Sequence, residues 1–268
     1  MPSQLGQRLL AALVLMAVTL AALWVGEPVW PGLVALVGAL MSWEWARLVG
    51  QGRFGPPGWV AMLAVFGATL YVGIAGRTEL GLAALVAGAA VAALVEFASA
   101  KSSERLWRAA GVFYVGLPSF ALVWLRADSD YGFSTCLWLL ALVWAIDTAA
   151  YFTGSTIGGP KLAPRISPKK TWAGLAGGCV GAGLIGAAAA LWFGAGLGWL
   201  IALSAALALL EQLGDLAESA VKRHFGVKDS SGLIPGHGGM LDRVDGLVAV
   251  ALGVAVLVLA TGRSPLAP

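Results

Sequence analysis

Long apolar stretches separated by short polar segments make up almost the whole chain. A helix needs about 20 apolar residues to cross the hydrocarbon core of a bilayer, which is roughly 30 Å thick. We therefore predict a membrane-spanning helix at each of nine stretches. Their centres lie near Val18, Val37, Phe66, Ala87, Leu117, Leu142, Gly183, Ala206 and Val254. The pattern predicts an all-α, polytopic integral membrane protein with about nine transmembrane helices.

The first apolar stretch also has features of a signal peptide. It is about 17 residues long, and it ends at Trp24, Glu27 and Pro28 without a clear small-x-small cleavage site. We therefore expect the chain to retain this stretch as its first span.

Composition agrees with a lipid environment. Of the 268 residues, 59% are hydrophobic and 12% are charged, so a soluble globule would expose too much apolar surface. The net charge of +3 mainly reflects basic residues between the spans, and no nucleic-acid partner is implied. Cys136 and Cys179 lie in or beside apolar stretches, so we predict neither a disulfide framework nor a thiolate metal site.

Basic residues are strongly biased to one side of the nine predicted spans. One side holds Arg8, Arg47, Arg53, Lys101, Arg105, Arg108, Lys161, Arg165, Lys169, Lys170, Lys222, Arg223, Lys228 and Arg243. The other side holds only Arg77, Arg126 and Arg263. Because cytoplasmic loops retain Lys and Arg, we predict a cytoplasmic N-terminus and an external C-terminus.

No linker or soluble domain interrupts the chain, and we predict a single membrane domain over residues 1–268. Within it, residues 1–130 form N-terminal transmembrane helices and residues 131–262 form a catalytic transmembrane region. Polar cytoplasmic loops are expected at residues 158–171 and 222–245. The glycines of the seventh span, such as Gly177 and Gly181, are interpreted as packing positions.

Charged residues, histidines and glycines gather between residues 219 and 246. This segment holds four basic residues, three aspartates and both histidines of the chain. Acidic residues also occur within the apolar stretches, where a carboxylate usually faces a partner or a wet cavity. They are Glu44, Glu96, Asp147, Glu211 and Asp215. The polar segment is therefore the predicted functional site.

The eighth span carries a polar stripe that leads into this segment. Helical spacing places Glu211, Asp215 and Glu218 mostly on one face, with Ser219 and Lys222 following. A structural alternative is a buried ion pair between Glu218 and Lys222 at i,i+4. For Asp215 we favour a functional role.

Carboxylates at the ends of two neighbouring spans form a candidate metal site. Asp215 can converge with Asp242 and Asp245 if the eighth and ninth spans are antiparallel neighbours. Hard divalent cations prefer such oxygen ligands. We therefore predict a magnesium site formed by these carboxylates.

Basic and glycine residues around these carboxylates suit phosphate groups. Arginine binds phosphate by bidentate hydrogen bonds and lysine as a point charge. The candidates are Lys222, Arg223, Lys228 and Arg243. Gly238 and Gly239 would let backbone N–H groups approach an anion. Carboxylates, a metal and basic residues together indicate phosphoryl or nucleotidyl transfer.

Two further features carry alternative interpretations. His237 is either a structural residue or a proton carrier and phosphate donor, and we favour the second. The loop at 158–171, with Lys169 and Lys170, is either a topogenic basic loop or a second phosphate clamp. We favour the clamp because Asp147 and Tyr151 lie on the preceding span.

The segment 219–245 resembles the signature of the phosphatidate cytidylyltransferase (CDP-diacylglycerol synthase) family. The family pattern is met at every fixed position. These are Ser219, Lys222, Arg223, Lys228, Asp229, His237, Gly238, Gly239, Asp242, Arg243 and Asp245. Upstream residues such as Gln212, Gly214 and Glu218 also look familial, so the resemblance covers about residues 140–250.

The resemblance implies that CTP and phosphatidate react to give CDP-diacylglycerol and pyrophosphate at the cytoplasmic face of the inner (plasma) membrane. It implies Mg²⁺ or Mn²⁺ at Asp215 and Asp242, with a second metal ion left open. It also implies a positioning role for Asp245 and phosphate neutralisation by the basic residues. The partners are thus CTP, phosphatidate and membrane lipid. Whether two copies of the chain form a homodimer is left open.

Three alternatives remain from the sequence. A related CTP-using lipid enzyme, such as a polyprenol kinase or an ether-lipid synthase, would share the phosphate chemistry. A transporter would also carry intramembrane carboxylates, although no inverted repeat is evident. A purely structural scaffold leaves the polar segment unexplained.

Overall fold

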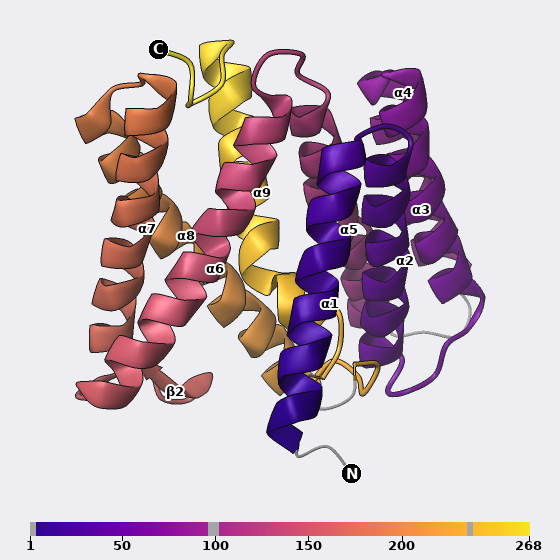
Figure 1. Cartoon of the computed structure of the whole chain (residues 1–268). Helices are drawn as coiled ribbons and strands as arrows, with labels where there is room; N and C mark the ends of the chain where they lie inside the picture. The colour runs from indigo at the N-terminus through magenta and orange to yellow at the C-terminus, as the bar shows by residue number, and fades with distance from the viewer. Residues whose placement is uncertain (1–3, 96–101, 235–237) are drawn as a thin grey trace. The chain divides into compact units, whose positions relative to one another are not determined.

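The computed structural model describes residues 4–95, 102–234 and 238–268 (Figure 1). Each of the nine predicted centres lies in a separate helix of this part of the chain. The helices are α1 (Gln4–Val25), α2 (Val29–Val49), α3 (Pro56–Ala75), α4 (Thr78–Leu94), α5 (Ser102–Arg126), α6 (Gly132–Thr156), α7 (Trp172–Phe193), α8 (Leu197–His224) and α9 (Leu241–Thr261).

The lengths of these helices match a membrane. Within the described ranges, seven helices are long and apolar enough to cross a bilayer. The remaining apolar segments are shorter and comprise Ala11–Val25 within α1 and Thr78–Leu94, which is α4. The prediction of an all-α, multi-pass membrane protein is confirmed.

The chain divides into two compact units. The first contains residues 1–127 and 225–244, and the second contains residues 128–224 and 245–268. The division differs from a simple split in sequence, because the polar segment after α8 belongs to the same unit as the N-terminal helices. The prediction of a single membrane domain stays a prediction.

In the first unit, α2, α3 and α5 pack against one another, α4 covers α3 and α5, and α1 lies against α2. Val65, Leu85 and Val115 are completely buried in its core. The segment after α8 returns to these helices, where the Phe225 ring lies 5.5 Å from the Trp107 ring.

In the second unit, α7 packs against both α6 and α8. A Cβ at Gly181 would lie 2.8 Å from the Ala149 Cβ, and one at Gly178 would lie 3.2 Å from the Ile146 Cγ2. The small residues let the backbones of α6 and α7 approach closely, as is common between membrane helices. The packing interpretation of these glycines is confirmed.

The polar loop between α6 and α7 folds as a small antiparallel hairpin of β1 (Lys161–Ala163) and β2 (Ser167–Thr171). The sequence predicts a polar loop at residues 158–171, and two short segments within it pair with each other as strands. Thr171 ends β2 and caps α7, since its side chain accepts a hydrogen bond of 3.0 Å from the Gly174 N–H. Lys169 and Lys170 are thereby held at the start of a membrane helix.

Candidate active site

Two glycines allow α8 and α9 to pack closely in the second unit. A Cβ at Gly214 would lie 2.6 Å from the Ala249 Cβ, and a Cβ at Gly246 would lie 2.6 Å from the Glu211 Oε1. Both distances are too short for real atoms, so a side chain at either position would push the helices apart. This close approach brings the beginning of α9 against the polar stripe of α8.

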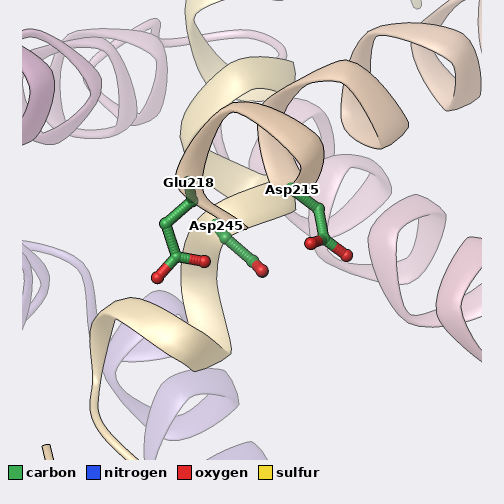
Figure 2. A group of neighbouring side chains, drawn as sticks. All are labelled: Asp215, Glu218 and Asp245. Carbon is green, nitrogen blue, oxygen red and sulfur yellow. The ribbon is translucent and has the colours of Figure 1, made fainter. Parts of the chain in front are cut away.

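Three carboxylates meet where these helices touch. Figure 2 shows Asp215 and Glu218 on α8 beside Asp245 on α9. One carboxylate oxygen from each residue lies within 4.8 Å of the others. Ser219 Oγ donates a hydrogen bond of 3.2 Å to Asp215 Oδ1. This all-oxygen set suits a hard divalent cation such as Mg²⁺.

Two lysines neutralise part of this negative charge. Lys170 forms an ion pair with Asp215, and Lys222 Nζ lies 3.2 Å from Glu218 Oε2. Glu218 and Lys222 are both buried. The i,i+4 ion pair that the sequence offered as an alternative is confirmed. Glu218 thus belongs both to an ion pair and to the carboxylate cluster, a combination that spacing along the sequence does not reveal.

A cavity of about 440 Å³ opens beside the cluster within the second unit. Its polar lining comes from Asp147 and Tyr151 on α6, from Lys169 and Lys170 on β2, and from Asp215 on α8. Asp147 and Tyr151, which favoured the interpretation of the loop as a phosphate clamp, thus face the same cavity as Lys169 and Lys170. Acidic and basic side chains here face the same space, so a metal and a phosphate group can be held together.

Gln212 lines the same cavity from one turn before Asp215. Its side chain is buried, with 8% of the residue exposed. Within the part of the chain that the structure describes, its Nε2 has no hydrogen-bond acceptor. A buried amide without a partner is costly, and a ligand in the cavity would relieve that cost. In the sequence, Gln212 is marked only as one of the upstream positions that resemble the family.

Asp242 organises the polar segment of the first unit. Its Oδ2 accepts hydrogen bonds from the Ser230 N–H at 3.0 Å, the Ser230 Oγ at 2.9 Å and the Gly239 N–H at 2.8 Å. The Gly239 N–H predicted to face an anion is thus engaged by a carboxylate. Gly238 has a φ of +87°, a conformation that favours glycine.

The remaining predicted residues lie as follows. Arg223, Lys228 and Arg243 are exposed, and the Arg223 Nε donates a hydrogen bond of 3.3 Å to the Ile166 carbonyl of the hairpin turn. His237 and Glu96 lie outside the described residues. Among the described carboxylates, Asp215 clusters with Glu218 and Asp245, and the assignment of metal to Asp242 stays a prediction.

Comparison with known proteins places this architecture in a family. A model described as the cytidylyltransferase family matches residues 6–261. A phosphatidate cytidylyltransferase from Brucella suis is 44% identical over 253 residues, covering 93% of this chain and 91% of that protein. The one from Pseudomonas aeruginosa is 37% identical, covering 96% and 98%. The one from Haemophilus influenzae is 35% identical, covering 91% and 95%.

Proposed function

The chain belongs to the cytidylyltransferase family, and we propose that it joins CTP to phosphatidate, releasing pyrophosphate and forming CDP-diacylglycerol. It is a membrane-bound nucleotidyltransferase of phospholipid biosynthesis. Its relatives of the same length carry the name phosphatidate cytidylyltransferase. The observation that carries the proposal is the cluster of Asp215, Glu218 and Asp245 beside a cavity lined by lysines.

The reaction is a single displacement at phosphorus. An oxygen of the lipid phosphate attacks the α-phosphorus of CTP, and the bond from that phosphorus to the bridging oxygen of the β-phosphate breaks. Pyrophosphate leaves with the electron pair of that bond. No covalent intermediate with the enzyme is needed, so the protein acts mainly by positioning and by neutralising charge.

Asp215 and Asp245 are the residues we propose to hold a divalent cation, with Glu218 beside them. Bound there, such an ion would neutralise charge on the triphosphate and on the departing pyrophosphate. The chemistry of the donors fits this role, since all three offer carboxylate oxygens. The sequence also predicts Asp242 as a ligand, and we retain that assignment as part of the proposal.

Basic residues complete the proposed site. Lys169 and Lys170 would bind phosphate groups in the cavity, and Lys170 would exchange its ion pair with Asp215 for contact with the nucleotide. We further propose phosphate contacts for Lys222, Arg223, Lys228 and Arg243, backbone contacts at Gly238 and Gly239, and a proton or hydrogen bond from His237.

The chain is a multi-pass membrane protein, and we propose the inner (plasma) membrane as its location. The bias of basic residues supports a cytoplasmic N-terminus and a cytoplasmic active site. CTP would then arrive from the cytoplasm and phosphatidate from the bilayer. Whether the chain forms a homodimer stays open.

Pyrophosphate release by the detergent-purified protein tests the proposal. CTP, phosphatidate and Mg²⁺ together should support release, and omission of any one of them, addition of EDTA or replacement of CTP by ATP should abolish it. A protein that phosphorylates a lipid alcohol without releasing pyrophosphate would instead be a kinase. Solute flux into liposomes without CTP turnover would indicate a transporter.

The absence of a covalent intermediate has its own test. Exchange of labelled pyrophosphate into CTP should require phosphatidate or its product, because the α-phosphorus passes directly to the lipid. Exchange with CTP alone would contradict direct transfer.

A further inference from the structure

Glu44 is a fully buried acidic residue on α2, with 0% of its surface exposed. It lies far in sequence from the polar segment that carries the family signature. A carboxylate in an apolar helix needs donors around it, and those donors show what it does.

Both oxygens of Glu44 accept hydrogen bonds from the segment between α8 and α9. Oε1 accepts from the Ser231 Oγ at 2.6 Å and from the Met240 N–H at 2.8 Å. Oε2 accepts from the Leu241 N–H at 2.7 Å and from the Ser230 Oγ at 3.1 Å. All of these residues belong to the first unit. One side chain of α2 therefore binds residues 230 and 231 as well as residues 240 and 241.

The two backbone donors belong to the beginning of α9, which starts at Leu241. The first N–H groups of a helix have no partner within the helix, and negative charge near them is favourable. Glu44 supplies this charge from another helix, while Asp242 supplies it from within the first turn by accepting from the Gly239 N–H. Glu44 and Asp242 together thus provide acceptors for the backbone N–H groups of residues 239–241.

Gly239 makes this contact sterically feasible. A Cβ at this position would overlap the Ser230 Oγ and lie against the Glu44 Oε1. Glycine lets the backbone pass beside the carboxylate. The presence of glycine at position 239, the second glycine of the signature, is therefore explained by packing, without any ligand.

We propose that Glu44 is a positioning residue for the reaction: it holds residues 230–231 and 240–241, and with them Asp242 and Arg243, in the geometry that transfer needs. The N-terminal helices, which carry none of the signature, thereby hold part of it in place. The effect on turnover rests on the proposed function, whereas the effect on the segment does not.

Glu44→Gln tests the proposal, because it keeps the size of the side chain but replaces one acceptor oxygen by a donor. We expect hydrogen exchange at the Met240 and Leu241 N–H groups to speed up at least tenfold, with exchange inside α2 and α3 unchanged. We expect kcat to fall about 10²-fold, as for a reacting group misplaced by roughly 1 Å, with a smaller change in the KM for CTP. Glu79→Gln, at an exposed position on α4, is the control and should change neither.

Unchanged exchange at Met240 and Leu241 in folded Glu44→Gln protein would overturn the proposal, whatever the activity. The proposal is also wrong if the apparent kcat falls only in proportion to the amount of folded protein. If wild-type protein shows no turnover, the proposed function fails, and the exchange measurement still decides the role of Glu44.

Ser231→Ala removes one of the four contacts of Glu44, together with the hydrogen bond that Ser231 Oγ accepts from the Leu233 N–H, and keeps the carboxylate. It is expected to lower kcat several-fold and to speed exchange at Met240, with no further effect when combined with Glu44→Gln. If Glu44→Gln does not fold, an unaltered exchange rate and kcat in Ser231→Ala would overturn the proposal.

Discussion

At the scale of single residues, the carboxylate cluster depends on the side chains that oppose its charge. Lys170 pairs with Asp215, and Lys222 pairs with Glu218. Hydrogen bonds between charged groups contribute about 1.5–3 kcal/mol when they are partly desolvated. A phosphate group bound in the cavity would offer these lysines a second set of acceptors.

Replacing Lys170 should therefore weaken nucleotide binding. Lys170→Ala is expected to raise the KM for CTP by about 10-fold or more, because it removes a charge-assisted contact. Lys170→Arg, which keeps the charge, should retain more activity. Arg165→Ala removes an exposed cation from the same hairpin without altering the cavity lining and serves as the control. Steady-state kinetics in which Lys170→Ala matches Arg165→Ala would exclude this role.

Replacing Gln212 should lower activity without lowering stability. Gln212→Leu replaces a buried amide, whose Nε2 has no acceptor in the described part of the chain, by an apolar group of similar size. Thermal unfolding in detergent should therefore occur at the same or a higher temperature, while kcat/KM should fall at least 10-fold. Leu213→Ala, at a neighbouring exposed position, should leave kcat/KM unchanged. A Gln212→Leu enzyme with full activity would show that the amide does not contact substrate.

Individual residues differ in how far the sequence could predict them. The Glu218 and Lys222 pair follows from helical spacing alone. The partners of Glu44 do not, because they lie more than 180 residues away along the chain. The role of Gln212 could not be predicted from the sequence either, because its amide is seen to lack a hydrogen-bond acceptor only when the surrounding described residues are known.

At the scale of elements, the contact between α8 and α9 determines whether the cluster exists. Gly214 and Gly246 stand at that contact, and neither position has room for a Cβ. The helices can be close neighbours only with small residues at these places. Their spacing in turn fixes the distance from Asp245 to the carboxylates of α8.

Gly214→Ala should disturb this contact. Inserting a methyl group into a packed interface costs about 1–3 kcal/mol, which exceeds the gain of up to about 1 kcal/mol in helix propensity. We expect a lower unfolding temperature and at least a 10-fold lower kcat. Gly198→Ala changes the same helix where nothing lies within 4 Å of the new Cβ, so it should be neutral or stabilising. Equal behaviour of the two variants would contradict the importance of the α8 and α9 contact.

The helices could be predicted from the sequence, whereas the hairpin could not. Each of the nine predicted stretches lies in a helix of the described ranges, because hydrophobic length is a strong signal in a membrane protein. Strands β1 and β2 contain lysines and a proline and are three and five residues long. Such strands show no alternation of apolar and polar residues, so no periodicity marks them.

At the scale of the whole molecule, the functional segments do not follow the order of the chain. The sequence placed the catalytic region at residues 131–262, whereas residues 225–244 belong to the compact unit of the N-terminal helices. Long-range contacts such as those of Glu44 produce this arrangement. Spacing along the sequence could not reveal them, because apolar helices offer many equivalent ways to pack.

Orientation in the membrane gives a prediction for the complete protein. In a background with Cys136→Ala and Cys179→Ala, Ser129→Cys should react with a membrane-impermeant maleimide in intact cells. Ser167→Cys, in the predicted cytoplasmic hairpin, should react only after the membrane is opened. If only Ser167→Cys is labelled in intact cells, the predicted orientation is reversed. If both variants are labelled in intact cells, the prediction that one span, α6, separates the two positions is wrong.

The reaction of wild-type and Asp215→Asn proteins, measured side by side, tests the central claim most directly. With CTP labelled at the α-phosphate, phosphatidate and Mg²⁺, wild-type protein should form labelled CDP-diacylglycerol and unlabelled pyrophosphate. Folded Asp215→Asn protein should be slower by about 10²–10³-fold, as expected when a key electrostatic contact is removed, whereas Asp130→Asn, an exposed change in the same unit, should match the wild type. No labelled lipid from the wild-type protein would contradict the function, and equal rates and equal Mg²⁺ dependence in Asp215→Asn would contradict the site.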